Sequence, residues 1–398
     1  MTCRVLSLDG GGAWALIQVL TLMDLYGEAA SGHQVLANFD LVAASSGGSL
    51  VLAGLVENLS LDNILQYFMD EQKRRSIFSP TTSLGDNLLQ TVLGVGPKYS
   101  ASAKLPAIER LLPTTGDSPL AGAMDGVVGP AGKPVHLLIV GFDYDRNRAI
   151  FFRSAPATQA GWGTGQPATV TLAGAVHAST NAPVNYFDAP ADLPDAPGRF
   201  WDGGITGCNN PAVSAVVEAL VLGYRSLDIR VLSLGTATVI FPLADPGVPP
   251  KPLEAPRPDS SLITDLKKLA AAILDDPPDA ATFIAHVMTG ANAGVPPSVV
   301  SRVVRMSPLV SPLPAAGGEW RPPPGWSLAQ FKYLANIDMD AVAQTDITYI
   351  DDYCRHWLVD NAPNQPIRMS GGAFDPQHPE IGYAKFSEAK AAWRVLFP

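Results

Sequence analysis

Three short segments of this sequence combine residues that could perform acyl transfer. The first is the run Asp9–Gly12, which follows a mostly apolar stretch, Val5–Leu8, where a strand is expected to pass into a helix. Glycines let a backbone approach a ligand closely, and a helix over Ala13–Tyr26 would direct its positive end at the same turn. This arrangement predicts a site for a permanent or transient negative charge.

The second segment offers a nucleophile. A buried strand predicted over Phe39–Ala44 leads into Ser45, Ser46, Gly47 and Gly48, with a helix expected over Ser49–Glu57. A serine on a tight turn between strand and helix, with small neighbours, is typical of a nucleophile elbow. The pattern small-x-Ser-x-Gly fits Ser45 with alanine at its first position. Shifted by one residue it fits Ser46, but the paired glycines favour Ser45.

The third segment offers a base. Asp202 follows Phe200 and Trp201 and precedes Gly203 and Gly204. A serine hydroxyl is a weak nucleophile until a base takes its proton. Enclosure by the aromatic pair would raise the pKa of the carboxyl group and make it a stronger base. An ordinary Asp-Gly turn is the alternative interpretation of this segment.

With these segments in this order, the chain resembles the patatin-like phospholipases, which are lipid acyl hydrolases. The resemblance covers Cys3 to Thr236 and more loosely the rest. It implies a three-layer α/β/α sandwich with a mostly parallel central sheet. The matching segments are Asp9–Gly12, Ala43–Gly47, Ser179–Pro183, Asp202–Gly204, Asn209–Pro211 and Val231–Thr236.

The resemblance implies a catalytic dyad without histidine. Ser45 would attack the acyl carbonyl, Asp202 would accept the proton, and the N–H groups of Gly10, Gly11 and Gly12 would bind the oxyanion. No cofactor and no metal are expected. His177, the histidine nearest to a motif, is predicted on the surface of a helix or strand.

One departure from the family concerns the glycine turn. The family commonly carries Arg or Lys two positions after the glycines, whereas this chain has Trp14, so the support that this cation gives to the oxyanion loop is not expected here. Trp14 either lines the acyl pocket or packs within its helix.

Two alternative functions stay open. An acyltransferase would use the same acyl-Ser45 and pass the chain to an alcohol or lysolipid. A non-enzymatic lipid or nucleotide sensor would keep the fold without the reaction. Headgroup, sn-1 or sn-2 preference, oligomeric state and the need for an activator are not encoded in any motif.

Composition limits the partners. The net charge of −10 argues against nucleic acid and against strong attraction to anionic membranes, so contact with lipid would be apolar and transient. The odd cysteine count of three favours a reducing compartment. With no signal peptide and no run of about 20 apolar residues, a soluble cytoplasmic protein is expected.

Proline distribution divides the chain. Residues 1–240 are predicted to form the catalytic core, which includes a hairpin of Val135–Phe142 and Ala149–Ser154. Residues 241–398 are predicted to form proline-rich loops and helices that pack on this core or cap it, within one continuous domain. Helices are expected over Ser261–Leu274, Asp279–Ala291 and Ile347–Val359. Ser83–Tyr99 is the candidate lid or lipid-contact segment, with a core-packed amphipathic helix as the alternative.

Overall fold

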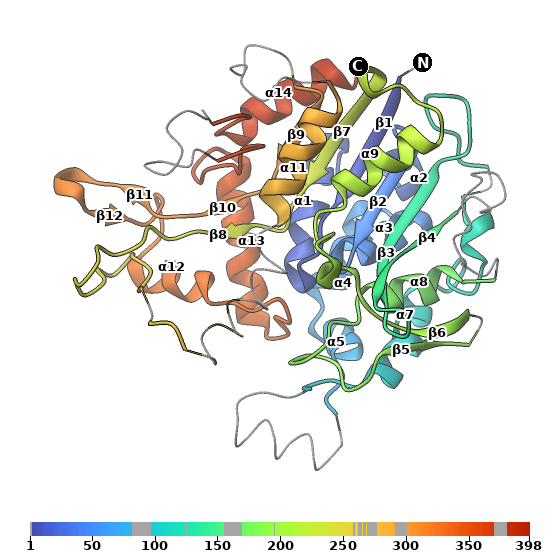
Figure 1. Ribbon diagram of the computed structural model, residues 1–398, viewed down its shortest axis with the longest axis horizontal. Coiled ribbons are helices and arrows are strands. Elements are labelled where there is room, and N and C mark those ends of the chain that lie inside the picture. Colours follow the sequence, from blue (N-terminus) through green and yellow to red (C-terminus); the bar gives the residue numbers. More distant parts are fainter. Residues whose placement is uncertain are drawn as a thin grey trace.

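A central sheet of eight strands runs through the molecule, with helices on both faces (Figure 1). The structure is a computed structural model. It describes residues 2–81, 97–124, 126–154, 169–194, 196–257, 259–261, 265, 268, 277–290, 301–369 and 380–398. The expected three-layer α/β/α sandwich with a mostly parallel sheet is confirmed.

The strands follow the order β5-β6-β3-β2-β1-β7-β9, and β4 also pairs with β3. Strands β1, β2, β3, β7 and β9 form the parallel part, whereas β4 and β6 run antiparallel to β3. The strand bounds are β1 Cys3–Leu8, β2 Leu41–Ser45, β3 His136–Asp143, β4 Arg148–Arg153, β5 Ala191–Leu193, β6 Ala196–Asp202, β7 Ile229–Leu234 and β9 Val303–Met306. The predicted hairpin is therefore β3 and β4.

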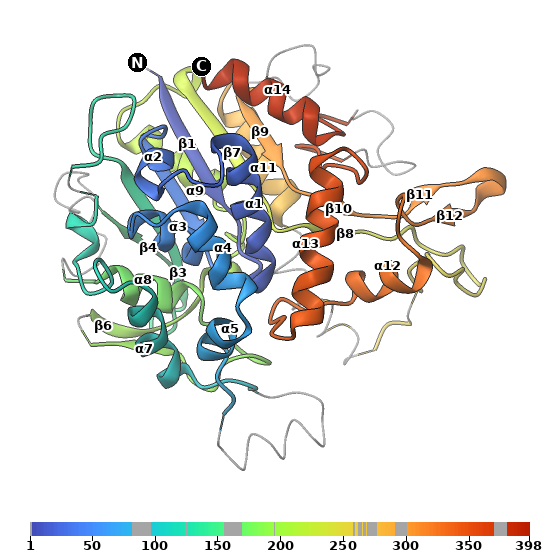
Figure 2. The ribbon, with the colours of Figure 1, turned by 180° about the vertical axis from the view of Figure 1, so that it is seen from behind.

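Alternating side chains along each strand divide the core into two layers. Leu6, Val42 and Leu232 face one helical layer, while Val5, Leu41 and Val231 face the other. The first layer contains α1 Leu16–Tyr26, α3 Gly47–Val56, α4 Leu61–Met69, α8 Leu172–Ser179 and α13 Gln344–Leu358, and the second contains α9 Ala212–Val221 and α11 Pro277–Met288. Figure 2 shows α1, α3 and α4 in front of the sheet.

Further elements flank these layers. The remaining helices are α2 Gly32–Leu36, α5 Glu71–Ile77, α7 Ala101–Leu111, α12 Leu328–Ala335 and α14 Phe386–Leu396. Two small strand pairs, β8 Thr238–Val239 with β10 Leu309–Val310 and β11 Leu313–Pro314 with β12 Trp320–Arg321, lie outside the central sheet. They belong to the part that extends to the side in Figure 1.

Residues after 240 contribute directly to the sandwich. Strand β9 pairs with β7 at one end of the sheet, and α11 packs against α9. The helices predicted over Asp279–Ala291 and Ile347–Val359 correspond to α11 and α13. Most of the predicted helix Ser261–Leu274, and residues 83–96 of the candidate lid Ser83–Tyr99, lie outside the described residues.

The register around β3 brings two strand ends together. Residues 136–140 of β3 pair with β2, residues 138–143 pair with β4, and residues 141–143 pair with β6. The residues of β3 that pair with β4 include residues that also pair with β2 and residues that also pair with β6. Strand β4 therefore occupies one edge of β3, and β2 and β6 share the other edge. They run in opposite directions, so their carboxyl ends meet where Ser45 pairs with Val140 and Asp202 with Gly141.

Candidate active site

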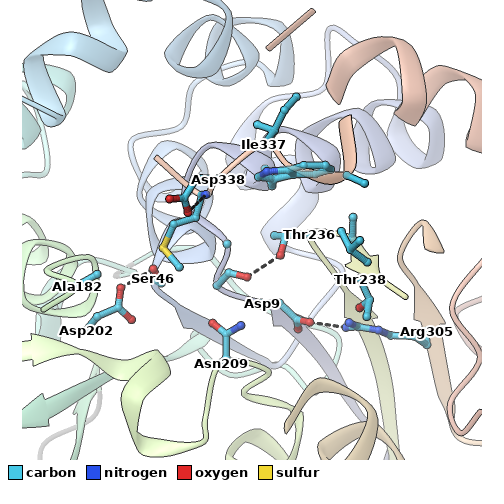
Figure 3. A pocket seen from close by; sticks show the side chains of 17 residues that line it. Asp9, Ser46, Ala182, Asp202, Asn209, Thr236, Thr238, Arg305, Ile337 and Asp338 are labelled. Atoms are coloured by element: carbon cyan, nitrogen blue, oxygen red, sulfur yellow. Dashed lines mark hydrogen bonds and ion pairs between the residues drawn. The ribbon is translucent and has the colours of Figure 1, made fainter. Parts of the chain in front are cut away.

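Ser46 occupies the turn between β2 and α3. Its backbone φ of 46° and ψ of −125° are unusual for a residue with a side chain, and they mark a strained turn. Ser46 precedes the first residue of α3, yet its side chain does not cap that helix. Instead Ser46 Oγ donates a hydrogen bond of 2.6 Å to Asp202 Oδ2 (Figure 3). This is the geometry of a nucleophile beside its base.

Asp202 ends strand β6 and is almost completely buried. Its Oδ1 accepts a hydrogen bond of 2.7 Å from the Gly204 N–H, and its own N–H donates to the Asn181 carbonyl over 2.9 Å. Burial raises the pKa of Asp202 to about 6, while the hydrogen bonds from Ser46 and Gly204 and the charge of Lys104 act in the opposite direction. The carboxylate is therefore a stronger base than a solvated aspartate, and it is still mostly ionised at pH 7.

The structure does not bring Ser45 to Asp202, which corrects the preference for that serine. Ser45 is the last residue of β2 and is fully buried, and its hydroxyl has no hydrogen-bond partner among the described residues. Alternation along the strand puts it on the same face as Leu41 and Ala43, which pack in the layer of α9. The chain leaves the strand one residue later, so the elbow pattern applies to Ser46.

The glycine turn lies against this elbow. An added Cβ on Gly47 would overlap the backbone of Gly12, and one on Gly48 would overlap the carbonyls of Leu8 and Asp9. Side chains at these positions would therefore force the turn and the elbow apart. Close approach of the two segments explains why both are rich in glycine.

The three predicted oxyanion donors differ in their hydrogen bonds. The Gly10 N–H donates to the Asn209 carbonyl over 2.8 Å, and the Gly10 carbonyl accepts from Thr236 Oγ1 over 2.6 Å. The predicted role of Gly10 as a donor is therefore wrong for this conformation, because its N–H already has an acceptor. Within the described part of the chain, no backbone hydrogen bond occupies the N–H of Gly11 or Gly12.

A buried ion pair between Asp9 and Arg305 fixes the start of the glycine turn to strand β9. Arg305 Nη1 lies 2.7 Å from Asp9 Oδ2, and both side chains are 2% exposed. Arg305 also donates to Ser233 Oγ and to Gln365 Oε1, which fixes the guanidinium in place. Burial raises the pKa of Asp9 to about 6, against the opposing effect of Arg305. The sequence analysis missed Arg305, which lies on β9 and has no local motif.

Two pockets of different character meet at Ser46. A pocket of about 340 Å³ is lined by Ser46 and Asp202 together with polar groups such as Asn209 and apolar groups such as Ile337, with Trp14 in its wall. Figure 3 shows Asp9, Asn209, Thr236 and Arg305 on one side of it. A narrow apolar pocket opens on the other side, and it is lined by Leu50, Ile77, Phe78, Ala182, Phe187 and Met339.

The C-terminal part of the chain completes this site. The Met339 carbonyl accepts a hydrogen bond of 2.8 Å from the Ala13 N–H, and Met339 lines both pockets. Asp338 accepts from Tyr186, and Asp340 accepts from both Lys98 and Tyr99. These contacts hold the segment 338–340 beside Ser46, a placement that no sequence motif indicated.

His177 is buried in α8, which corrects its predicted position on a surface. Burial, with the charge of Lys104, lowers the pKa of His177 to about 2, so the ring is neutral. Across the described residues, no three His, Cys, Asp or Glu side chains gather in a way suited to a metal ion. No helix in the same residues is long and apolar enough to cross a membrane.

Comparison with known proteins identifies relatives of this chain. The model of a family described as patatin-like phospholipase matches residues 6–216. A protein of Escherichia coli named cUMP-AMP-activated phospholipase is 27% identical over 252 residues, which are 62% of this chain and 68% of that protein. The crystal structure of VipD from Legionella pneumophila aligns with a TM-score of 0.34 and 10% identity, over 88% of this chain and 66% of that one, just under two thirds of its length.

Proposed function

Since this chain belongs to the patatin-like phospholipase family, a family of lipid hydrolases, we propose that it cleaves fatty acyl esters of lipids with Ser46 as nucleophile and Asp202 as base. The observation that carries this proposal is the 2.6 Å hydrogen bond between the two side chains at a strained elbow. The family match ends at residue 216, so it includes both residues.

The first step forms an acyl-enzyme. Asp202 Oδ2 accepts the proton of Ser46 as Oγ attacks the ester carbonyl, and the carbonyl oxygen becomes an oxyanion. The alcohol product, a lysolipid or glycerol, takes a proton from Asp202 as it leaves. The raised pKa of Asp202 suits both transfers, because the group must accept a proton and then release it.

Oxyanion stabilisation falls to the N–H groups of Gly11, Gly12 and Gly47. The first two are without a backbone acceptor in the described residues, and Gly47 opens α3, where the helix leaves its first N–H groups unpaired. Gly12 and Gly47 are packed together, so their donors lie near each other. Loss of one such donor costs on the order of 3 kcal/mol of transition-state stabilisation in comparable sites.

The two pockets suggest how a lipid would lie. The apolar lining beside Leu50 and Phe187 suits the acyl chain, for which this pocket of about 20 Å³ has to widen, and the larger pocket beside Asn209, lined by both polar and apolar groups, suits the rest of the substrate. Water activated by Asp202 would then release the fatty acid. Acyl transfer to an alcohol differs only in the acceptor, so acyltransferase activity is the second outcome to assay.

The third alternative, a sensor without chemistry, is less well supported because the serine and the aspartate are in contact. The relative from Escherichia coli is named for activation by cUMP-AMP. This nucleotide is therefore included in the assay as a candidate activator. We also propose that residues 1–240 form the catalytic core, that residues 241–398 pack on or cap it within one domain, and that Ser83–Tyr99 serves as a lid.

The test compares the wild type with three variants on a fluorogenic phospholipid and a p-nitrophenyl ester, each with and without cUMP-AMP. We expect Ser46→Ala and Asp202→Asn to lose activity, the former by about 10⁴-fold or more. Ser45→Ala is the matched control, and it should keep wild-type activity. Loss of activity in Ser45→Ala with retention in Ser46→Ala would refute the assignment. If the wild type is inactive with and without cUMP-AMP, and also transfers no acyl group to a lysolipid acceptor, the non-enzymatic sensor would be favoured.

A further inference from the structure

Lys104 is a fully buried lysine whose charge acts on Asp202, the proposed base. It lies on α7, and its ammonium donates a hydrogen bond of 2.9 Å to Asn181 Oδ1. The Nζ atom also lies 3.9 Å from the centre of the Phe187 ring. Phe187 lines the narrow apolar pocket, so this cation lies just outside the proposed acyl site.

Asn181 connects Lys104 to Asp202. Its side-chain oxygen accepts from Lys104, while its backbone carbonyl accepts from the Asp202 N–H over 2.9 Å. The Asn181 amide group donates in turn to the Ala189 carbonyl over 2.8 Å, which fixes the side chain. Lys104 and Asp202 are thus joined through one residue, and no direct ion pair between them is present in the described structure.

The charged groups around this pair come from several elements. Asp202 faces the Ser46 hydroxyl at the start of α3 and Lys104 on α7. Lys104 faces Asp202 and the neutral His177 on α8, and Asp188 binds the first N–H of α7. Asp202 is thus the acidic group whose charge acts on Lys104.

A buried ammonium without a carboxylate in contact is costly, and a methionine of similar length would avoid that cost. Keeping a lysine here is therefore better explained by an effect on a neighbouring group than by packing. The neighbour in question is the proposed base.

We propose that Lys104 is a positioning residue that keeps Asp202 ionised at neutral pH, by its positive charge and by the Asn181 bridge. The proposal rests on the role of Asp202 as base. A nearby positive charge favours the carboxylate form, whereas burial alone favours the protonated form that cannot accept the Ser46 proton. Burial lowers the pKa of Lys104 itself well below its usual value, and the Asp202 charge opposes this, so each of the two groups favours the charged form of the other.

The test titrates Asp202 directly, without relying on turnover. Protein labelled with ¹³C at the aspartate carboxyl carbon is titrated by NMR, and the Asp202 signal is identified by its absence in Asp202→Asn. In Lys104→Met we expect the Asp202 midpoint to rise by about one pH unit. Lys104→Arg should stay near the wild type. Lys73→Met removes another ammonium that lies over an aromatic ring, 5.3 Å from the Tyr67 ring centre, and should leave Asp202 unchanged.

An unchanged Asp202 midpoint in a folded Lys104→Met variant would overturn the proposal, since a purely structural lysine would alter stability and not this titration. If the wild type hydrolyses lipid, the acid limb of its kcat/KM profile should move with the midpoint. At pH 5.5, the variant should then lose about 30-fold relative to its own value at pH 8. Absence of turnover would count against the proposed function and leave the titration result standing.

Discussion

The buried base should reduce the stability of the fold at neutral pH, and Asp202→Asn should remove that cost. The pKa of Asp202 is about 6 in the folded protein, against 3.8 for the same group in the unfolded chain. A raised folded pKa means that the folded state holds the proton more tightly. The associated stability is fully present below pH 3.8 and is lost as the pH rises through 6.

The size of the effect follows from that difference in pKa. A difference of about two pH units corresponds to about 3 kcal/mol at pH 8 and to about 0.5 kcal/mol at pH 4. The asparagine can keep the hydrogen bond from Gly204 through its oxygen and can donate to Ser46 through its amide. We therefore expect Asp202→Asn to stabilise the fold at pH 8 by up to about 3 kcal/mol, and to do little at pH 4.

Urea denaturation of the wild type and Asp202→Asn at pH 4 and pH 8 measures this difference. Both pH values avoid the sequence pI of about 5.0, where low net charge promotes aggregation. Asp192→Asn, at an exposed position of β5, serves as the control and should change stability little at either pH. An Asp202→Asn variant that is no more stable than the wild type at pH 8, or equally stabilised at both pH values, would refute the reasoning.

Three further substitutions test other parts of the site. Gly12→Ala should lower kcat/KM by about 100-fold, because the Gly12 φ is +56° and the new Cβ would meet the Met339 carbonyl. Gly27→Ala is the control, with φ of +93° and open space around it, and it should leave kcat/KM unchanged. Arg305→Met should destabilise the fold by about 3 kcal/mol in urea denaturation, and adding Asp9→Asn should recover most of that loss. Leu50→Trp should fill the narrow apolar pocket and lower the rate on long-chain esters relative to short-chain esters about tenfold.

The fold was predictable because its signals are local. Apolar strands alternating with helices up to Thr238 indicate a parallel sheet, and the turn at residues 144–147 indicates the hairpin of β3 and β4. Strand β9 was not predicted, since its four residues lie beyond the proline-rich residues 242–258 and are buried through pairing with the distant strand β7. Pairing over such a sequence distance leaves no periodic pattern.

The site was predictable to within one residue. Glycines allowed the elbow pattern to be placed on either Ser45 or Ser46, because a strand end can be shifted by one position without changing the composition around it. Only the register decides, since one position puts a hydroxyl into the core and the next puts it on the turn. Likewise, Gly10 and Gly11 look equivalent in sequence, and a carbonyl from Asn209 distinguishes them.

A topological feature explains why the proposed dyad would need no third residue to hold its base. Strands β2 and β6 meet end to end on one edge of β3, so Ser46 and Asp202 are each fixed by a strand that ends beside the other. In a triad the base is a histidine that must be oriented by an acid. Here the Gly204 N–H binds the carboxylate directly, and the Asn181 carbonyl fixes the Asp202 backbone at the end of β6. What remains to be supplied is charge, because a buried carboxylate tends to take up a proton, and Lys104 is the cation placed to prevent it.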